Sequence, residues 1–324
     1  MSSPAVMPAS PPPTAVPVWR RALVYGVFAL FAAWCIKAFW HDITQIDLTP
    51  LKTGWTAVLA AGALSLFNYA LRVWRWRLYL NKLGHTFSLR FVALTFMSGF
   101  AFTLSPGKLG EMVRARYYQP KGLSVSATSG AFFIERLLDL LVMILLASAA
   151  LVDIQAYRSF LWVAVALVGG LLASVAIMPW ARIDEAMGTI PVGKFRQVVK
   201  AMAHMFVSAR QFLTPGMLVA GLLLGMVSWG AEAVGLKLVA DVVGVQPLPV
   251  SAAMGIYAVA IIVGALSFLP GGLGSTEAVM AALLFAHGYT MPQAILLTLV
   301  CRLLTLWLAV LIGWLCVWAL RGEA

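Results

Sequence analysis

Residues 105–111 read Ser-Pro-Gly-Lys-Leu-Gly-Glu, and residues 269–275 read Leu-Pro-Gly-Gly-Leu-Gly-Ser. The first stretch ends the apolar run 89–105, and the second ends the apolar run 250–269. Proline and glycine both break helices, so a helix that reaches either stretch must stop inside an apolar region. The shared pattern Pro-Gly-x-Leu-Gly indicates one structural motif that is used twice.

The charged residues that follow the two motifs match as well. The first motif is followed by Glu111 and then Arg136, and the second by Glu277 and then Arg302. The separation between the acid and the arginine is identical in the two halves, and each arginine stands in an apolar helix. A double match of this kind predicts an internal duplication.

A further match precedes the motifs, where Asn68 and Glu232 stand at corresponding places in long apolar runs. The period of about 165 residues is too long for a solenoid repeat and is typical of transporter repeats. We assign repeat 1 to about 19–155 and repeat 2 to about 156–321, within a single transmembrane domain that covers 19–321.

The composition excludes a soluble globular protein. Hydrophobic residues make up 62% of the 324 positions and charged residues only 11%, whereas soluble domains are about one quarter charged. The apolar residues form runs, several of them long enough to cross a bilayer, which takes roughly 20 residues. These runs are 22–40, 54–80, 89–105, 125–151, 159–180, 213–240, 250–269, 275–287 and 292–320.

The basic residues favour one topology. If both motifs are the tips of re-entrant hairpins, six helices span the membrane, both termini are cytoplasmic, and the basic loops all lie inside, as the positive-inside rule requires. If 89–105 instead crosses fully, Arg114, Arg116, Lys121 and the basic segment 182–210 lie outside. We therefore predict an all-α polytopic membrane protein with an inverted repeat, six spanning helices and two re-entrant helical hairpins, or about eight helices by hydropathy.

Several other classes of function find no support. The net charge of +11 follows from the basic loops, and the chain has no nucleic-acid reader motif, so we expect no nucleic-acid partner. Residues 1–18 are rich in Pro, Ala and Ser and predict a disordered tail. We expect no metal and no cofactor, because the histidines are scattered and no nucleotide-binding motif is present. The cysteines Cys35, Cys301 and Cys316 are typical of small buried hydrophobic residues.

Ionisable residues at membrane depth are costly and usually functional. They suit either ion pairs that fix helix packing or a polar cavity for a lipid headgroup, and the two readings are compatible. We expect no catalytic residues among them. The candidates for substrate binding are Lys108, Glu111, Glu135, Arg136, Asp139, Glu232, Glu277 and Arg302.

The two motifs also leave backbone groups unpaired inside the membrane, which is tolerated only beside protein or a wet cavity. We expect the helices that follow to start near Gly110 and Ser275 and to offer anion sites at their N-termini. The alternative is that the glycines only allow close packing. The residues of the re-entrant turns are Pro106, Gly107, Gly110, Pro270, Gly271, Gly272 and Gly274.

A basic and aromatic cluster lies at the end of the run 54–80. Arg72, Arg75 and Arg77 alternate with Trp74 and Trp76. This pattern is typical of an interfacial anchor whose arginines snorkel to the headgroups. Specific binding of anionic lipid headgroups is the alternative.

Three segments carry a resemblance to a known family: PGKLGE at 106–111, FFIERLLDLL at 132–141 and FLPGGLGSTEA at 268–278. They resemble the flippase-like membrane domain of lysylphosphatidylglycerol synthases, over residues from about 20 to 320. The resemblance implies a stand-alone member in the bacterial inner membrane. Bifunctional members move aminoacylated lipid between leaflets and carry an aminoacyl-transferase domain. This chain shows no such domain, so we do not expect lipid aminoacylation.

From the residues and the resemblance we expect a flippase-like protein, not an enzyme, that binds or moves an anionic phospholipid or an isoprenoid-linked lipid. The expected partners are membrane lipids with anionic headgroups and lipid-synthesis enzymes. The alternatives are a membrane enzyme, or an accessory subunit, for a lipid-linked substrate in envelope glycolipid or hopanoid synthesis. We also expect Glu111–Arg136 and Glu277–Arg302 to lie around one central cavity, so that Arg136→Lys and Arg302→Lys lose activity in a folded protein.

Overall fold

The structure is a computed structural model that describes residues 44–151, 155–186, 193–244 and 246–321. The predicted tail 1–18 and the first apolar run 22–40 lie outside these residues. The described residues from Ile46 onward belong to one compact unit. They contain helices and no strand, so the prediction of an all-α membrane protein is confirmed.

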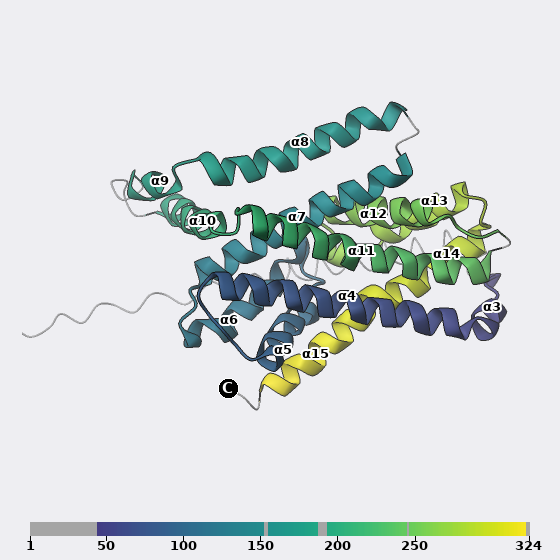
Figure 1. Ribbon diagram of the computed structural model, residues 1–324. Coiled ribbons are helices and arrows are strands. Elements are labelled where there is room, and N and C mark those ends of the chain that lie inside the picture. The colour runs from purple at the N-terminus through teal and green to yellow at the C-terminus, as the bar shows by residue number, and fades with distance from the viewer. Residues whose placement is uncertain (1–43, 152–154, 187–192, 245, 322–324) are drawn as a thin grey trace, which may run out of the picture. The chain divides into compact units, whose positions relative to one another are not determined.

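Long helices form the body of this unit and run roughly side by side (Figure 1). Two stretches, α4 and α11, are long and apolar enough to cross a bilayer, as is the continuous stretch Met291–Leu320. The apolar part of α8 joins α9 through a 65° bend, and this pair qualifies as a fourth. Helix α7 is similarly long but carries three charged residues in its middle. The bounds are α3 Thr49–Thr53, α4 Trp55–Lys82, α7 Val125–Leu151, α8 Gln155–Ile177, α9 Trp180–Ala186, α11 Pro215–Val243, α14 Met291–Arg302, η6 Leu303–Trp307 and α15 Leu308–Leu320.

Shorter helices flank both Pro-Gly motifs. At 1.5 Å per residue, the 17 residues of α12 reach about 25 Å, which is less than the roughly 30 Å of a bilayer core. The chain reverses at each motif, so both arms are re-entrant in form, and the two turns contact one another. The first arm has α5 Leu89–Ser98, η1 Gly99–Phe102, η2 Pro106–Val113, α6 Arg114–Tyr118 and η3 Gln119–Lys121; the second has α12 Val250–Leu266, η5 Pro270–Gly272 and α13 Ser275–Ala286.

Two residues that the predicted repeat aligns, Asn68 and Glu232, meet between α4 and α11. Helices α4 and α11 pack along one another, and Asn68 Nδ2 donates a hydrogen bond of 2.7 Å to Glu232 Oε1. Lys108 and Gly272, at the same place in the two motifs, both have a left-handed φ, of 57° and 66°, although the first motif continues as a 3₁₀ helix to Val113 and the second leads into an α-helix at Ser275. The predicted repeat therefore aligns two residues, Asn68 and Glu232, that are in contact.

The described residues of the basic segment 182–210 are almost all helical. Helix α10 (Lys194–Arg210) packs against α7 and α9. A methyl group on Gly130 of α7 would lie 2.8 Å from the carbonyl oxygen of Met205, so the glycine permits this close approach. The outer side of α10 exposes Phe195 and Val198, and together with its basic residues this makes the helix amphipathic, as is typical of a helix at a membrane surface.

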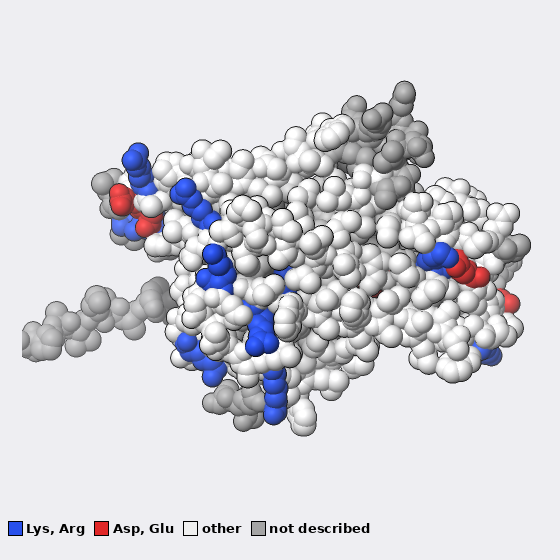
Figure 2. All heavy atoms as spheres, in the orientation of Figure 1, with Lys and Arg blue, Asp and Glu red and all other residues white. Residues whose placement is uncertain are grey.

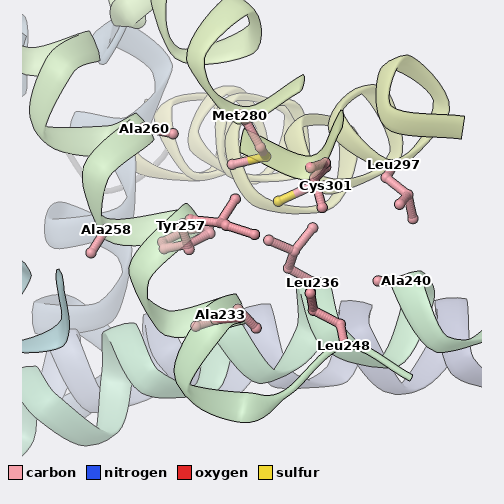
Figure 3. Close-up of a cluster of buried hydrophobic side chains, with 14 of the residues drawn as sticks. Ala233, Leu236, Ala240, Leu248, Tyr257, Ala258, Ala260, Met280, Leu297 and Cys301 are labelled. Atoms are coloured by element: carbon pink, nitrogen blue, oxygen red, sulfur yellow. The ribbon is translucent and has the colours of Figure 1, made fainter. Parts of the chain in front are cut away.

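A buried apolar cluster joins α11 to the second re-entrant arm (Figure 3). Leu236 of α11, Tyr257 of α12 and Met280 of α13 are buried there together with Leu297 and Cys301 of α14. The burial of Cys301 agrees with the expectation from the sequence. This packing fixes α12 and α13 against the spanning helices and so positions the second turn.

Most of the basic side chains in view gather over the end of the molecule that carries α6, α9 and α10, where acidic spheres lie beside α9, and a few basic and acidic spheres lie together at the other end, near α3 (Figure 2). The exposed basic residues of α6, α9, α10 and the neighbouring helix ends are Lys82, Arg90, Arg116, Lys121, Arg182, Arg210 and Arg321.

Candidate functional site

Two carboxylates of α7 form the centre of a buried ion network. Glu135 and Asp139 lie four residues apart and therefore point to one side of the helix. Arg136 Nη2 lies 3.0 Å from Glu135 Oε1 and 3.1 Å from Asp139 Oδ2. Its other terminal nitrogen approaches Glu111 Oε2 of the first turn only to 4.0 Å. The expected neighbourhood of Glu111 and Arg136 is present, but the acids of α7 are the closer partners.

Two arginines of α4 complete the centre. Arg75 Nη2 donates a hydrogen bond of 2.7 Å to Asp139 Oδ1 and lies 3.3 Å from Glu135 Oε1. Arg72 Nη2 lies 3.7 Å from the same oxygen of Glu135. Both arginine side chains are buried. Removing a charge from water is expensive, and these carboxylates offset part of that cost.

Our interpretation of Arg72 and Arg75 as snorkelling anchors is therefore wrong. Helix α7 carries two buried acids but only one arginine between them. The arginines of the neighbouring helix α4 supply the further positive charge that these acids need. Arg77 does fit the anchor, because its guanidinium carbon lies 5.6 Å from the ring centre of the exposed Trp74. The basic cluster thus divides between two faces of α4.

Arg114 belongs to the network, although the sequence analysis placed it in a loop. Its Nη2 lies 3.5 Å from Glu111 Oε2 and 3.4 Å from Glu135 Oε2. Its guanidinium carbon lies 4.2 Å from the ring centre of Trp76 and 4.8 Å from that of Phe96, within range of a cation–π interaction. Arg114 thus links the first turn to α7. The sequence analysis missed Arg114, although its spacing of three residues from Glu111 allows the two to pair on one helical face.

The first turn presents Lys108 in a strained conformation. A left-handed φ at a residue other than glycine costs roughly 1–2 kcal/mol, and Lys108 has φ of 57°. The turn is held by Ser105 Oγ, which accepts a hydrogen bond of 2.6 Å from the Gly110 N–H. Glu111 is buried and accepts a hydrogen bond of 2.9 Å from Thr103 Oγ1. Among the described residues, no carboxylate lies within 4.0 Å of the Lys108 amine.

The second turn is closed by Arg302. Its Nε donates to Glu277 Oε1 at 2.5 Å, and its Nη2 donates to the carbonyl oxygen of Gly271 at 2.7 Å. Glu277 Oε2 in turn accepts a hydrogen bond of 2.6 Å from the N–H of Gly274. The expected pairing of Glu277 with Arg302 is therefore present and also fixes the backbone of the turn.

The structure does not place a free helix N-terminus at either turn. Residues Pro106–Val113 form a 3₁₀ helix, and the α-helix begins only at Arg114 rather than near Gly110. Helix α13 does begin at Ser275, but the carboxylate of Glu277 already caps it. An internal carboxylate therefore occupies the place where we expected an external anion.

A cavity of about 300 Å³ lies where the two turns, α7, α11 and α12 meet. Most of its wall is apolar, and its charged side chains come from the network and the turns. The lining residues are Ser105, Lys108, Phe133, Arg136, Leu137, Asp139, Leu140, Met143, Trp229, Ile261, Ile262, Gly264, Ala265, Leu266, Leu269, Gly271, Gly272, Thr276, Arg302 and Leu306.

Four of the predicted substrate-binding residues line this cavity: Lys108, Arg136, Asp139 and Arg302. Glu111, Glu135 and Glu277 stand behind them as the partners of the arginines. Glu232 lies elsewhere, in a second and smaller group between α4 and α11. The described residues contain no group of three or more potential metal-binding side chains.

Known proteins share this chain's pattern over most of its length. The chain is 26% identical, over 297 residues, to a UPF0104 membrane protein of Methanothermobacter thermautotrophicus, and the match covers 85% of this chain and 86% of that protein. The family model described as the lysylphosphatidylglycerol synthase TM region matches residues 20–313, so the resemblance seen in the motifs is confirmed. The chain is a multi-pass membrane protein that belongs to the family of the lysylphosphatidylglycerol synthase transmembrane region.

Proposed function

We propose that this protein binds the anionic headgroup of a membrane lipid in the cavity between its two re-entrant turns and helps that headgroup to cross the bilayer. The observation that carries the proposal is the meeting of Lys108, Arg136 and Arg302 at one otherwise largely apolar cavity. A lipid with an anionic head has the same division into a charged and an apolar part.

The charges of the wall favour an anion. Among the described residues, three cationic side chains and one acid, Asp139, line the cavity. Arg302 donates through Nε to Glu277 and through Nη2 to the carbonyl oxygen of Gly271, whereas the Nε of Arg136 has no hydrogen-bond partner. Its planar guanidinium suits a phosphate oxygen pair, which a lysine ammonium cannot match. Lys108 adds a cation without a carboxylate partner among the described residues.

The apolar wall suits the hydrocarbon next to the headgroup. Phe133, Leu137 and Leu140 of α7 face the cavity opposite Ile261 and Ile262 of α12. A volume of about 300 Å³ is at the small end of ligand pockets. The cavity therefore takes the headgroup and its first carbons, while the acyl or isoprenoid chains extend into the membrane.

Purified protein in liposomes tests this proposal. The probes are fluorescent phosphatidylglycerol and fluorescent phosphatidylcholine in the outer or inner leaflet, and the measurement is the fraction that a membrane-impermeant quencher reaches with time. We expect leaflet exchange of phosphatidylglycerol above that of protein-free vesicles, and a loss of it in Arg136→Gln. Equal rates with and without protein for every anionic probe would contradict transport. Covalent change of the probe would support the enzyme alternative instead.

We further propose that the protein lies in the bacterial inner membrane with the basic end, which carries α6, α9 and α10, in the cytoplasm. The gathering of basic side chains in Figure 2 supports this orientation. Single cysteines at Arg116 and Arg196, in a chain without its native cysteines, should resist an impermeant thiol reagent added to intact cells. A cysteine at exposed Gly288 should react. The opposite labelling pattern would reverse the orientation.

A further inference from the structure

Glu232 lies in the middle of α11, away from the cavity and almost fully buried, with 2% of its surface exposed. Ser65 Oγ donates a hydrogen bond of 2.8 Å to its Oε2, and Asn68 Nδ2 donates one of 2.7 Å to its Oε1. Both donors are neutral. Within the described part of the chain, no Lys, Arg or His nitrogen lies within 4.0 Å of this carboxylate.

A buried carboxylate without a cation is costly in its charged form, more so at membrane depth. Its immediate neighbours can also hold the neutral form. Asn68 Oδ1 is buried and has no hydrogen-bond partner. Because the two ends of an amide are nearly the same in shape, a flip of this side chain would turn Oδ1 toward Glu232, where it can accept a hydrogen bond from a protonated carboxyl group.

Among the described residues that face Glu232, one is charged. The titratable side chains that face it are Tyr69 and Arg72 of α4, Tyr257 of α12 and Cys301 of α14. A small cavity of about 10 Å³ lies between Glu232, Cys301, Ser65 and Thr305. That volume is close to the smallest that holds a water molecule, which could carry a proton to or from the carboxyl group.

Two short connections join Glu232 to the ligand cavity. On α11, Trp229 stands one turn before it and donates a hydrogen bond of 3.1 Å from Nε1 to Asp139 Oδ1. On α4, Arg72 stands one turn after Asn68; its guanidinium carbon lies 5.2 Å from the ring centre of Trp229. A negative charge on Glu232 would therefore act on the arginines and on Asp139 that shape the cavity.

We propose that Glu232 is a proton-binding site coupled to the cavity, so that the protein takes up a proton when an anionic headgroup binds and releases it when the headgroup leaves. The protein takes up a proton, rather than releasing one, because like charges repel: an anion in the cavity disfavours a second negative charge at Glu232. Headgroup affinity then rises as the pH falls, by at most about tenfold per pH unit for one linked proton. This coupling rests on the proposed function, but the proton site itself does not.

The proton site is tested without any lipid substrate. Infrared spectra of the full chain in detergent should show the carbonyl band of a protonated carboxylic acid that titrates with pH and disappears in Glu232→Gln. Glu185→Gln, which removes an exposed carboxylate of α9, should keep the band. A wild-type spectrum without such a band, or a band that persists in Glu232→Gln, would overturn the proposal.

The coupling is tested by calorimetric titration of short-chain phosphatidylglycerol, whose phosphodiester stays singly charged from neutral to mildly acid pH. Titrations in two buffers of different ionisation enthalpy give the number of protons taken up. We expect uptake by wild type and Glu185→Gln, and none by Glu232→Gln, whose affinity should not change with pH. Binding without proton uptake would refute the coupling, whereas absence of binding would refute the headgroup site and leave the infrared result to decide on the proton. If the affinity for phosphatidylglycerol instead changes with the sodium concentration at fixed pH, Glu232 is a sodium site and the proposal is contradicted.

Discussion

Arg302 holds Glu277 through its Nε at 2.5 Å, whereas Arg136, its counterpart in the first half, reaches Glu111 only at 4.0 Å. The second pair closes a turn, because Arg302 also donates to the carbonyl oxygen of Gly271. The first arginine keeps 22% of its side chain exposed and faces the cavity. Two arginines at matching places in the sequence thus have different surroundings. We therefore expect substitution of Arg302 to affect stability and substitution of Arg136 to affect ligand binding.

We expect Arg302→Lys to destabilise the fold by about 1–3 kcal/mol, because a lysine amine cannot serve both the carboxylate and the Gly271 carbonyl in the same geometry. Arg136→Lys should stay within about 1 kcal/mol of wild type but bind phosphatidylglycerol at least about tenfold more weakly. Thermal unfolding in detergent and calorimetric titration measure the two effects. If the two variants show the same stability and the same affinity for phosphatidylglycerol, the different surroundings of the two arginines have no effect on function.

Lys108 allows its charge and its backbone to be tested separately. Lys108→Gly removes the amine and relieves the left-handed φ, so it should keep or raise the melting temperature, by an amount that corresponds to at most about 1–2 kcal/mol. Lys108→Gln removes only the charge. Both should weaken phosphatidylglycerol binding, while Lys121→Gln, at an exposed site, should not. Full binding by Lys108→Gln would exclude the amine from the headgroup site.

Arg114 and Arg116 provide a matched pair, two residues apart on α6. Arg114→Ala leaves buried Glu111 and Glu135 with fewer cations, and breaking a buried pair in this way costs about 3–5 kcal/mol. Arg116→Ala removes an exposed side chain and should change the free energy of unfolding by less than about 0.5 kcal/mol. Urea or thermal unfolding of both variants decides the matter. A similar small effect in both would mean that Arg114 is not held as the structure shows.

Close packing at the first re-entrant arm depends on Gly313 of α15. A methyl group there would lie 2.8 Å from the carbonyl carbon of Phe100 and 2.9 Å from the Cα of Ala101. Gly313→Ala should therefore destabilise the fold by about 1–3 kcal/mol. Gly170→Ala, in α8 with no atom within 4 Å of the new methyl group, should be neutral or stabilising by up to about 1 kcal/mol. Comparable melting temperatures for the two variants would mean that α15 does not pack against Phe100 and Ala101 as closely as the structure shows.

Much of the fold could be predicted from the sequence because two simple signals mark it. Apolar runs set the helices, and the helix 125–151 has the predicted bounds. The equal separation of acid and arginine in the two halves also placed Glu277 beside Arg302. Local patterns cannot show which face of α4 meets α7, however, so the buried Arg72 and Arg75 were mistaken for anchors. The cap of α13 by Glu277 escaped prediction because only coordinates show where a carboxylate points.

The contact between the two turns has a consequence for the symmetry of the molecule. Lys108 in one turn corresponds to Gly272 in the other, and these turns touch at the centre. A dimer of identical subunits would bring two lysines together there, where each would repel the other and the anion site would carry a doubled charge. If the chain arose by the duplication that its sequence predicts, the fusion of two halves lets one turn carry a lysine while the other carries a glycine. One half can then specialise in the ligand while its twin provides the packing surface.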